Sequence, residues 1–336
     1  MTLAIETIDL THRYKKLVAL DRLHLRVEQG CIYGFIGPNG AGKTTTLRIL
    51  AGLLTPTKGE VRLLGERLTT RAAQRLVGYM PDFFGVYDDL RVWEYLDFFA
   101  RCYGLRGARL RQVVDELLDL VDLAGKRDAF VQTLSRGMQQ RLCLAHALVH
   151  DPPILLLDEP ASGLDPRARV ELRELLRTLR DMGKTIMLSS HILSELAEVC
   201  DAIGIIDHGR MVISGPLAEV QQQIATGARA RLRIARESDV VLALALLQRQ
   251  PLVSAVGAAP ADPRSLVIDF SEPLDEEQCA AILAELVKAG VAVSEFSARS
   301  ENLEELFLRL TASAGQLDGQ AAAVGANAGN TASVRR

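Results

Sequence analysis

One octapeptide is more informative than any other part of this chain of 336 residues. It reads Gly37-Pro38-Asn39-Gly40-Ala41-Gly42-Lys43-Thr44 and matches the pattern G-x-x-x-x-G-K-[ST] at every specified position. The apolar run before it, Cys31 to Ile36, predicts a buried strand, and residues 45–50 after it predict a helix. A strand, a glycine-rich loop and a helix in this order predict a phosphate-binding loop. We therefore expect a site for a nucleoside triphosphate, which we interpret as ATP.

The residue types of this loop explain how it would hold phosphates. Glycines let backbone N–H groups approach the phosphates closely, and the helix N-terminus adds the positive end of its dipole. Lys43 would reach the β- and γ-phosphates, and the Thr44 hydroxyl would ligate Mg²⁺. A glycine-rich turn with an unrelated lysine is the plainer interpretation, and the complete pattern makes it weak. The residues predicted to bind the cofactor here are Gly37, Pro38, Asn39, Gly40, Ala41, Gly42, Lys43, Thr44 and Thr45.

Composition narrows the class of protein. A hydrophobic fraction of 48% is ordinary for a globular protein, and the length suggests one large domain and one smaller domain. A formal net charge of −3 without long basic runs argues against nucleic acid as the main partner. The apolar runs are shorter than the about 20 residues that a membrane span needs, and no secretory signal is evident. The five scattered cysteines predict small core residues in a reducing compartment, the cytoplasm.

Hydrophobic periodicity predicts two domains. Short apolar strands alternate with helical patterns over residues 1–221, which favours an α/β domain with a largely parallel sheet. From about 88 to 150 the pattern is mainly helical, and Ser135 would cap a helix that runs through Leu148. Over residues 222–312 the order β-α-β-β-α-β suggests a small ferredoxin-like α+β domain, and the Gly-, Ala- and Asn-rich residues 313–336 predict a disordered tail. Expected strands include residues 3–10, 23–28, 61–64, 77–80, 154–157, 185–188, 202–206, 229–234, 266–270 and 291–296.

Two adjacent carboxylates follow the fully apolar strand at residues 154–157. Asp158 would hold Mg²⁺ through water. Glu159 would orient or activate the attacking water as a general base. A strand that ends at the surface would explain this pair on its own. Because the pair lies downstream of a complete phosphate-binding loop, we favour the catalytic interpretation.

Three further motifs complete a specific order along the chain. They are Leu134-Ser135-Arg136-Gly137-Met138-Gln139-Gln140-Arg141 before the carboxylates, then Ser162-Gly163-Leu164-Asp165, and finally Ser189-Ser190-His191 after a strand. With these motifs, residues 3–220 resemble the nucleotide-binding subunit of an ATP-binding-cassette (ABC) transporter. Each motif alone has a plainer interpretation, such as a helix cap for Ser135 or a satisfied histidine for His191. Together, in this order, those interpretations become weak.

The resemblance implies a fold and residue roles. The fold would be a P-loop NTPase cassette with a RecA-like core, an antiparallel β part and a helical subdomain. Tyr14 would stack on adenine, with an ordinary strand-end tyrosine as the alternative. Ser135 and Gly137 would bind the γ-phosphate of ATP held by an opposite subunit, and Asp165 would lie in a loop that communicates across this dimer. His191 would contact the γ-phosphate and position the water. Two cassettes would therefore close head to tail on two ATP molecules.

Two positions depart from the family's usual pattern. Asp82 stands where the family usually has a Gln that touches Mg²⁺ and the attacking water. A carboxylate can still ligate Mg²⁺, so Asp82 is a predicted metal ligand, although it adds negative charge near Glu159. The segment Leu134 to Arg141 resembles the signature motif of the family. In it, Arg136 and Met138 replace the more common Gly and Gln. This form resembles the subfamily that pairs with ABC-2-type membrane proteins and includes exporters.

Aromatic residues are concentrated between Tyr79 and Tyr103. A helical core explains those at helical spacing, but Phe83, Phe84 and Tyr87 have no helical period. In the family this region receives a short cytoplasmic helix of the membrane subunit. We therefore expect these three side chains to line that groove.

The sequence therefore predicts an ATPase that uses ATP and Mg²⁺, with an integral membrane permease and a second cassette as partners and no nucleic acid. It would lie at the inner face of the cell membrane, and export is favoured over import. One alternative is a soluble ABC ATPase that acts on ribosomes or nucleic acid. Such proteins usually carry two cassettes or a long coiled coil, and only 92 positions (135 − 43) separate Lys43 from Ser135. A second alternative is a regulatory scaffold that hydrolyses ATP only weakly. Glu159 and His191 argue against this alternative, while Asp82 keeps it open.

Overall fold

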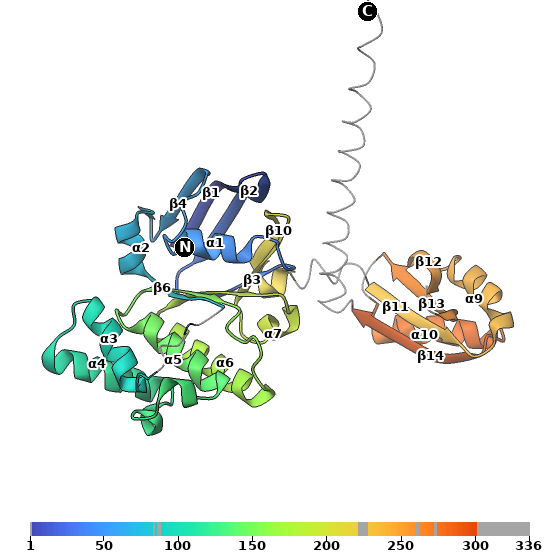
Figure 1. Cartoon of the computed structure of the whole chain (residues 1–336). Helices are drawn as coiled ribbons and strands as arrows, with labels where there is room; N and C mark the ends of the chain where they lie inside the picture. Colours follow the sequence, from blue (N-terminus) through green and yellow to red (C-terminus); the bar gives the residue numbers. More distant parts are fainter. Residues whose placement is uncertain are drawn as a thin grey trace, which may run out of the picture. The chain divides into compact units, whose positions relative to one another are not determined.

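The computed structural model describes residues 2–82, 85, 89–220, 228–259, 262–271 and 274–300 (Figure 1). The chain forms two compact units, one comprising residues 1–217 and the other beginning at Ala218. Among the described residues, the first unit contains two sheets and the second unit one, and each unit has its own cluster of buried apolar side chains. The expected tail at 313–336 lies outside the described residues. Within the described ranges, no helix is long and apolar enough to cross a membrane.

The main sheet of the first unit has six strands in the order β10-β9-β3-β8-β7-β6. All neighbouring pairs are parallel except the edge pair of β10 and β9. β3, β7 and β8 are buried along their whole length, as expected for strands covered on both faces. The prediction of a largely parallel sheet is confirmed. The strands are β3 (Ile32–Ile36), β6 (Val77–Met80), β7 (Ile154–Asp158), β8 (Thr185–Ser190), β9 (Ala202–Asp207) and β10 (Arg210–Pro216).

An antiparallel sheet in the order β2-β1-β4-β5 completes the β part of this unit. The first two strands are longer than predicted. They continue pairing to Tyr14 and Leu17, because backbone pairing does not require apolar side chains. Only the turn at residues 15–16 separates them, and Lys15 adopts a φ of 52° there. The strands are β1 (Leu3–Tyr14), β2 (Leu17–Glu28), β4 (Lys58–Leu63) and β5 (Glu66–Arg67).

Helices cover both faces of the main sheet. Figure 1 shows α1 on the side of the antiparallel strands and α5 and α6 on the other side. α3 and α4 pack against each other and against α5. Ser135 caps α5 as predicted, since its Oγ accepts the Met138 N–H at 3.3 Å. The helices are α1 (Lys43–Leu50), α2 (Thr70–Leu76), α3 (Val92–Cys102), α4 (Gly107–Leu120), α5 (Arg136–Leu148), α6 (Pro166–Asp181) and α7 (Leu193–Ala197), with short 3₁₀ turns at Ala124–Lys126 and Val131–Thr133.

The second unit has the predicted ferredoxin-like fold. Its elements follow the order β-α-β-β-α-β, and its antiparallel sheet has the order β12-β13-β11-β14. Alternate residues of β11, namely Ala230, Leu232 and Ile234, point into a core shared with both helices. The elements are β11 (Ala228–Ile234), a 3₁₀ turn (Glu237–Asp239), α9 (Val240–Leu247), β12 (Val253–Ala259), β13 (Asp262–Phe270), α10 (Glu276–Lys288) and β14 (Val293–Ser300).

The cysteines fit the sequence expectation only in part. All five are free thiols, and Cys143 and Cys200 are buried. Burial raises the pKa of Cys143 to about 12, so this thiol stays neutral. Cys102 is exposed, so its prediction as a core residue is wrong. It is the last residue of α3, between exposed Arg101 and exposed Tyr103.

Candidate functional site

The phosphate-binding loop connects β3 to α1, as the sequence predicts. Gly42 precedes the helix with a φ of 110°, a conformation that side chains beyond glycine rarely adopt. A Cβ at Gly42 would lie 2.7 Å from the carbonyl oxygen of Ala19. A Cβ at Gly37 would lie 2.4 Å from the carbonyl oxygen of Ile206. The loop thus runs so close to neighbouring backbone that only glycine fits at both positions.

Three hydrogen bonds anchor this loop. The Gly209 N–H, in the turn between β9 and β10, donates to the Ala41 carbonyl at 2.9 Å. The Thr46 hydroxyl donates to the Gly42 carbonyl at 2.9 Å, and the Gly37 N–H donates to the Ser190 carbonyl at 3.4 Å. The loop is therefore a rigid element, which is what preorganised N–H donors for an anion require.

Lys43 is buried at the start of α1, with a side chain that is 6% exposed. Its Nζ donates to the Gly37 carbonyl at 2.7 Å and to the Pro38 carbonyl at 3.4 Å. The same Nζ lies 3.5 Å from Oε1 of Glu159. The Lys43 side chain thus folds back over the loop. Two carbonyls and one carboxylate offset the free-energy cost of burying its charged ammonium group.

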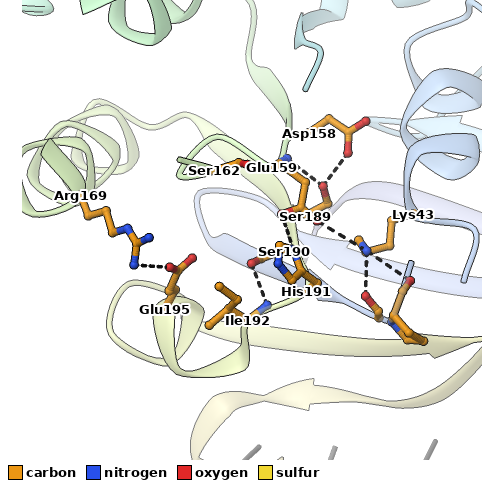
Figure 2. A network of polar contacts seen from close by, with 12 residues as sticks. Lys43, Asp158, Glu159, Ser162, Arg169, Ser189, Ser190, His191, Ile192 and Glu195 are labelled. Atoms are coloured by element: carbon orange, nitrogen blue, oxygen red, sulfur yellow. Dashed lines mark hydrogen bonds and ion pairs between the residues drawn. The ribbon is translucent and has the colours of Figure 1, made fainter. Parts of the chain in front are cut away.

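The two predicted carboxylates end β7 beside β8 (Figure 2). Asp158 is 1% exposed, and its Oδ1 accepts a hydrogen bond from the Ser189 hydroxyl at 2.7 Å. Glu159 has a φ of 50°, in the left-handed region, and its N–H donates to the same hydroxyl at 3.0 Å. Consecutive residues of a strand point to opposite faces of the sheet. The φ of Glu159 departs from strand geometry, and its side chain lies toward Lys43.

The structure brings His191 to the same carboxylate. Its Nδ1 lies 2.9 Å from Oε2 of Glu159. An ionised carboxylate can only accept hydrogen bonds, so the proton of this contact is on Nδ1. Glu159 therefore lies between two cationic or proton-bearing groups, with one oxygen facing Lys43 and the other facing His191. These predicted residues come from α1 and from the ends of β7 and β8.

The oxygen donors at this site fit Mg²⁺. Within the part of the chain that the structure describes, nothing hydrogen-bonds the second carboxylate oxygen of Asp158. The hydroxyl of half-buried Thr44 offers a further hard oxygen ligand. No cluster of three or more His, Cys, Asp or Glu suited to a metal occurs among the described residues.

Asp82 directly follows Pro81 after β6, and its side chain is exposed. Near the site, burial and, to a smaller extent, the Asp158 carboxylate raise the pKa of Tyr79 to about 12. Tyr79 therefore stays neutral and adds no negative charge. Among the described residues, no hydrogen bond or ion pair joins Asp82 to another site residue, and its role as a metal ligand stays a prediction.

The signature residues lie in the first turn of α5. Ser135 is exposed and Gly137 is half-buried. Asp165 caps α6, since its Oδ1 accepts the Ala168 N–H at 2.8 Å. The sequence does not predict the contact between the first turn of α5 and the loop at residues 162–165. A Cβ at Gly163 would lie 2.4 Å from Cζ of Arg136, so this guanidinium packs on the loop.

Tyr14, at the end of β1, is 41% exposed and packs edge-to-face on His12, with ring centroids 4.6 Å apart. The side chain is thus partly open to solvent, and adenine stacking stays a prediction. Phe83, Phe84 and Tyr87 lie outside the described residues, and their role in docking also stays a prediction.

Sequence reasoning missed three residues around the carboxylates. Ser189 stands in the sequence only as part of the motif Ser189-Ser190-His191, and nothing in that motif predicts its contacts with both carboxylate residues. Arg169 and Glu195 form an ion pair at 2.6 Å between α6 and α7, seen at the edge of Figure 2. Arg169 also donates through Nε to the Leu164 carbonyl at 3.1 Å. A single sequence carries no signal for such contacts between distant segments.

A phosphate-binding loop at the carboxyl edge of a parallel sheet, facing an Asp-Glu pair at the end of β7, defines a P-loop nucleoside triphosphatase. The sequence profile of the family described as "ABC transporter" matches residues 20–162. The chain belongs to the ATP-binding subunits of ABC transporters, a family that binds and hydrolyses ATP to power transport and pairs with membrane permease subunits.

Individual relatives extend the likeness over both units. The daunorubicin/doxorubicin resistance ATP-binding protein DrrA of Streptomyces peucetius is 36% identical over 312 residues, which cover 92% of this chain and 93% of that protein. Nod factor export ATP-binding protein I of Paraburkholderia xenovorans is 37% identical over 311 residues, covering 92% and 97%. A solved ATP-binding subunit of an ABC transporter superimposes with a TM-score of 0.59 at 32% identity, over 66% of this chain and 92% of that chain.

Proposed function

We propose that this chain is the ATP-hydrolysing subunit of an ABC exporter of the ABC-2 type. Two relatives that match more than nine-tenths of the chain support this proposal, because one is named for drug resistance and the other for Nod factor export. Their likeness extends into the ferredoxin-like unit, because it covers 92% of this chain. The signature form with Arg136 and Met138 agrees with the same subfamily.

The observation that carries the proposed chemistry is the position of the Glu159 carboxylate between Lys43 and His191. Glu159 acts as the general base that accepts a proton from the attacking water. Lys43 is held at 3.5 Å from this base by an ion pair. The phosphates of ATP offer Lys43 a stronger anionic partner, so nucleotide binding releases the base from its ion pair.

His191 donates its Nδ1 proton to Glu159 and so orients the carboxylate. When ATP is bound, a second proton on Nε2 lets this nitrogen donate a hydrogen bond to the γ-phosphate. Thr44, Asp158 and Asp82 hold Mg²⁺. When bound, the cation neutralises charge on the β- and γ-phosphates. Tyr14 stacks on the adenine.

The active unit is a dimer with a second cassette, which is a copy of this chain or a paralogue. Ser135 and Gly137 of one cassette complete the γ-phosphate site of the other, and Asp165 communicates between them. Ser135 supports this role because its hydroxyl lies exposed at the N-terminus of α5, where a helix favours anions.

The membrane partner is an integral permease, which docks on Phe83, Phe84 and Tyr87. The ATPase then works at the cytoplasmic face of the membrane. The domains are a cassette at 1–221, with its helical subdomain at about 88–150, an accessory domain at 222–312 and a tail at 313–336. A soluble ATPase acting on ribosomes or nucleic acid has no specific observation in its favour.

The test is capture of the partner with a trapped variant. Tagged Glu159→Gln protein is purified with ATP from detergent-solubilised membranes, and co-purifying proteins are identified by mass spectrometry. A stoichiometric protein with several membrane spans is the expected result, together with loss of more than 99% of the ATPase activity. Lys43→Ala is the control, because it removes a phosphate ligand and should not form the closed dimer. Recovery of ribosomal or DNA-processing proteins without a permease would contradict the proposal.

A further inference from the structure

One buried hydroxyl contacts both carboxylate residues of the site. Ser189 lies in β8, is 0% exposed and is drawn at the centre of Figure 2. Its Oγ lies 2.7 Å from Oδ1 of Asp158 and 3.0 Å from the backbone nitrogen of Glu159. Both distances are those of good hydrogen bonds.

The direction of these two hydrogen bonds follows from chemistry. A hydroxyl has a single proton, and a backbone N–H can only donate. The Glu159 N–H therefore donates to Ser189, and Ser189 donates its proton to the Asp158 carboxylate. Both hydrogen bonds need the serine oxygen at the same place, so one side chain fixes two acidic residues relative to each other.

No other described group takes over this task. Lys43 donates hydrogen bonds to the Gly37 and Pro38 carbonyls. Its ion pair is with Glu159 rather than with Asp158. Asp158 therefore depends on Ser189 for its orientation among the residues that the structure describes. The hydroxyl occupies one oxygen of the carboxylate and leaves the other for a cation.

Glu159 gains from the same contact in a different way. A non-glycine residue with a φ of 50° is strained, and such strain persists where surrounding contacts hold the backbone. The hydrogen bond from the Glu159 N–H to Ser189 holds this backbone. It thereby keeps the side chain turned toward Lys43 and His191.

We propose that Ser189 is a positioning residue for the magnesium–ATP site, which orients the Asp158 carboxylate toward the cation and holds Glu159 in its base position. This inference rests on the roles proposed above for Asp158 and Glu159. In this role Ser189 acts through Asp158 and Glu159.

The same strand offers a matched control. Thr185 begins β8, is 2% exposed, and its hydroxyl accepts the Gly30 N–H at 3.0 Å. It is a buried hydroxyl with a backbone partner, at the opposite end of the strand from the carboxylates. Thr185→Val removes that hydrogen bond without touching the site. A purely structural role of Ser189 predicts equal behaviour of Ser189→Ala and Thr185→Val.

The deciding readout is nucleotide binding without turnover. The dissociation constant of a fluorescent, non-hydrolysable ATP analogue is measured with Mg²⁺ and with EDTA for the full chain and both variants. We expect Mg²⁺ to tighten binding in the wild type and Thr185→Val by the same factor within twofold. In Ser189→Ala this factor falls at least fivefold. In ATPase assays, Ser189→Ala lowers kcat at least tenfold and raises KM for magnesium–ATP about as much as the magnesium factor falls.

Each alternative result has a definite meaning. If Ser189→Ala and Thr185→Val give the same magnesium factor and the same kcat within twofold, the inference is wrong. A wild-type factor near one also overturns it, because Asp158 would then not hold a cation. If Ser189→Ala fails to fold, Ser189→Cys replaces it, since Cys fills a similar volume but is a weak hydrogen-bonding group. Unchanged hydrolysis in Glu159→Gln would refute the proposed base, while the magnesium factor would still decide the role of Ser189.

Discussion

His146 of α5 should make the first unit sensitive to acid. Its ring stacks on Phe99 of α3 with centroids 3.7 Å apart, and its Nδ1 lies 3.3 Å from the Tyr95 hydroxyl. Burial and, to a smaller extent, the neighbouring His150 lower the pKa of His146 from 6.5 to about 4. The folded protein therefore keeps this imidazole neutral at pH values where the unfolded chain protonates it.

The size of the effect follows from this pKa. Because the folded pKa is the lower one, the unfolded state binds more protons between about pH 4 and 6.5. Stability is therefore complete above pH 6.5 and falls as the pH is lowered through this window. With 1.36 kcal/mol per pKa unit, the loss due to His146 is about 2 kcal/mol at pH 5 and about 3 kcal/mol below pH 4.

The assay is urea unfolding at pH 7.5 and pH 5.0, followed by the fluorescence of Trp93. This residue is the chain's single tryptophan and lies in α3, so it reports on the first unit. We expect His146→Phe, which retains a stacking ring, to lose about 2 kcal/mol less than the wild type on acidification. Tyr95→Phe is the control, because it removes the hydrogen bond but keeps the imidazole. Equal losses in the wild type and His146→Phe would refute the reasoning.

Three further substitutions test the packing and the loop. Gly78→Ala places a Cβ 2.2 Å from a backbone carbonyl oxygen of α5 and should lower the free energy of unfolding by about 2 kcal/mol or more, as measured by thermal unfolding. In the control Gly125→Ala the new Cβ meets open space, so the free energy of unfolding should change by no more than about 0.5 kcal/mol. Asp201→Ala removes the acceptor of a backbone N–H of β3 at 2.8 Å and should cost about 1–3 kcal/mol in urea unfolding. Gly42→Ala forces a side chain into a φ of 110° and should weaken ATP binding at least tenfold in a fluorescence titration, and unchanged affinity would contradict the close-packed loop.

Local signals account for what the sequence predicts well. Ser135 caps α5 and the helix ends at Leu148, because a cap residue and a helical period act within a few residues. β7 is predicted almost to the residue, because a short apolar run ending in charged residues is a strong signal of a buried parallel strand. β12 (Val253–Ala259) was not delimited from the sequence, because its small residues give no clear alternation.

Contacts between distant segments could not be predicted in the same way. The ion pair of Arg169 with Glu195 joins two helices, and both residues carry the ordinary pattern of a charged helix surface in the sequence. The packing of exposed Arg136 on the loop at Gly163 is likewise a contact between distant segments for which the sequence carries no signal.

The register of two neighbouring strands is what assembles the candidate site. β7 and β8 pair in parallel from Ile154 with Thr185 to Asp158 with Ser189. A shift by one residue would move every side chain of a strand to the opposite face, so it would separate the Asp158 carboxylate from the Ser189 hydroxyl. The Thr185 N–H, which donates to the Pro153 carbonyl at 2.9 Å, fixes the register at the far end of the pair. The sequence predicts both strands and both carboxylates. Because it contains no signal for their register, it names the residues of the site without showing that a serine holds two of them in place.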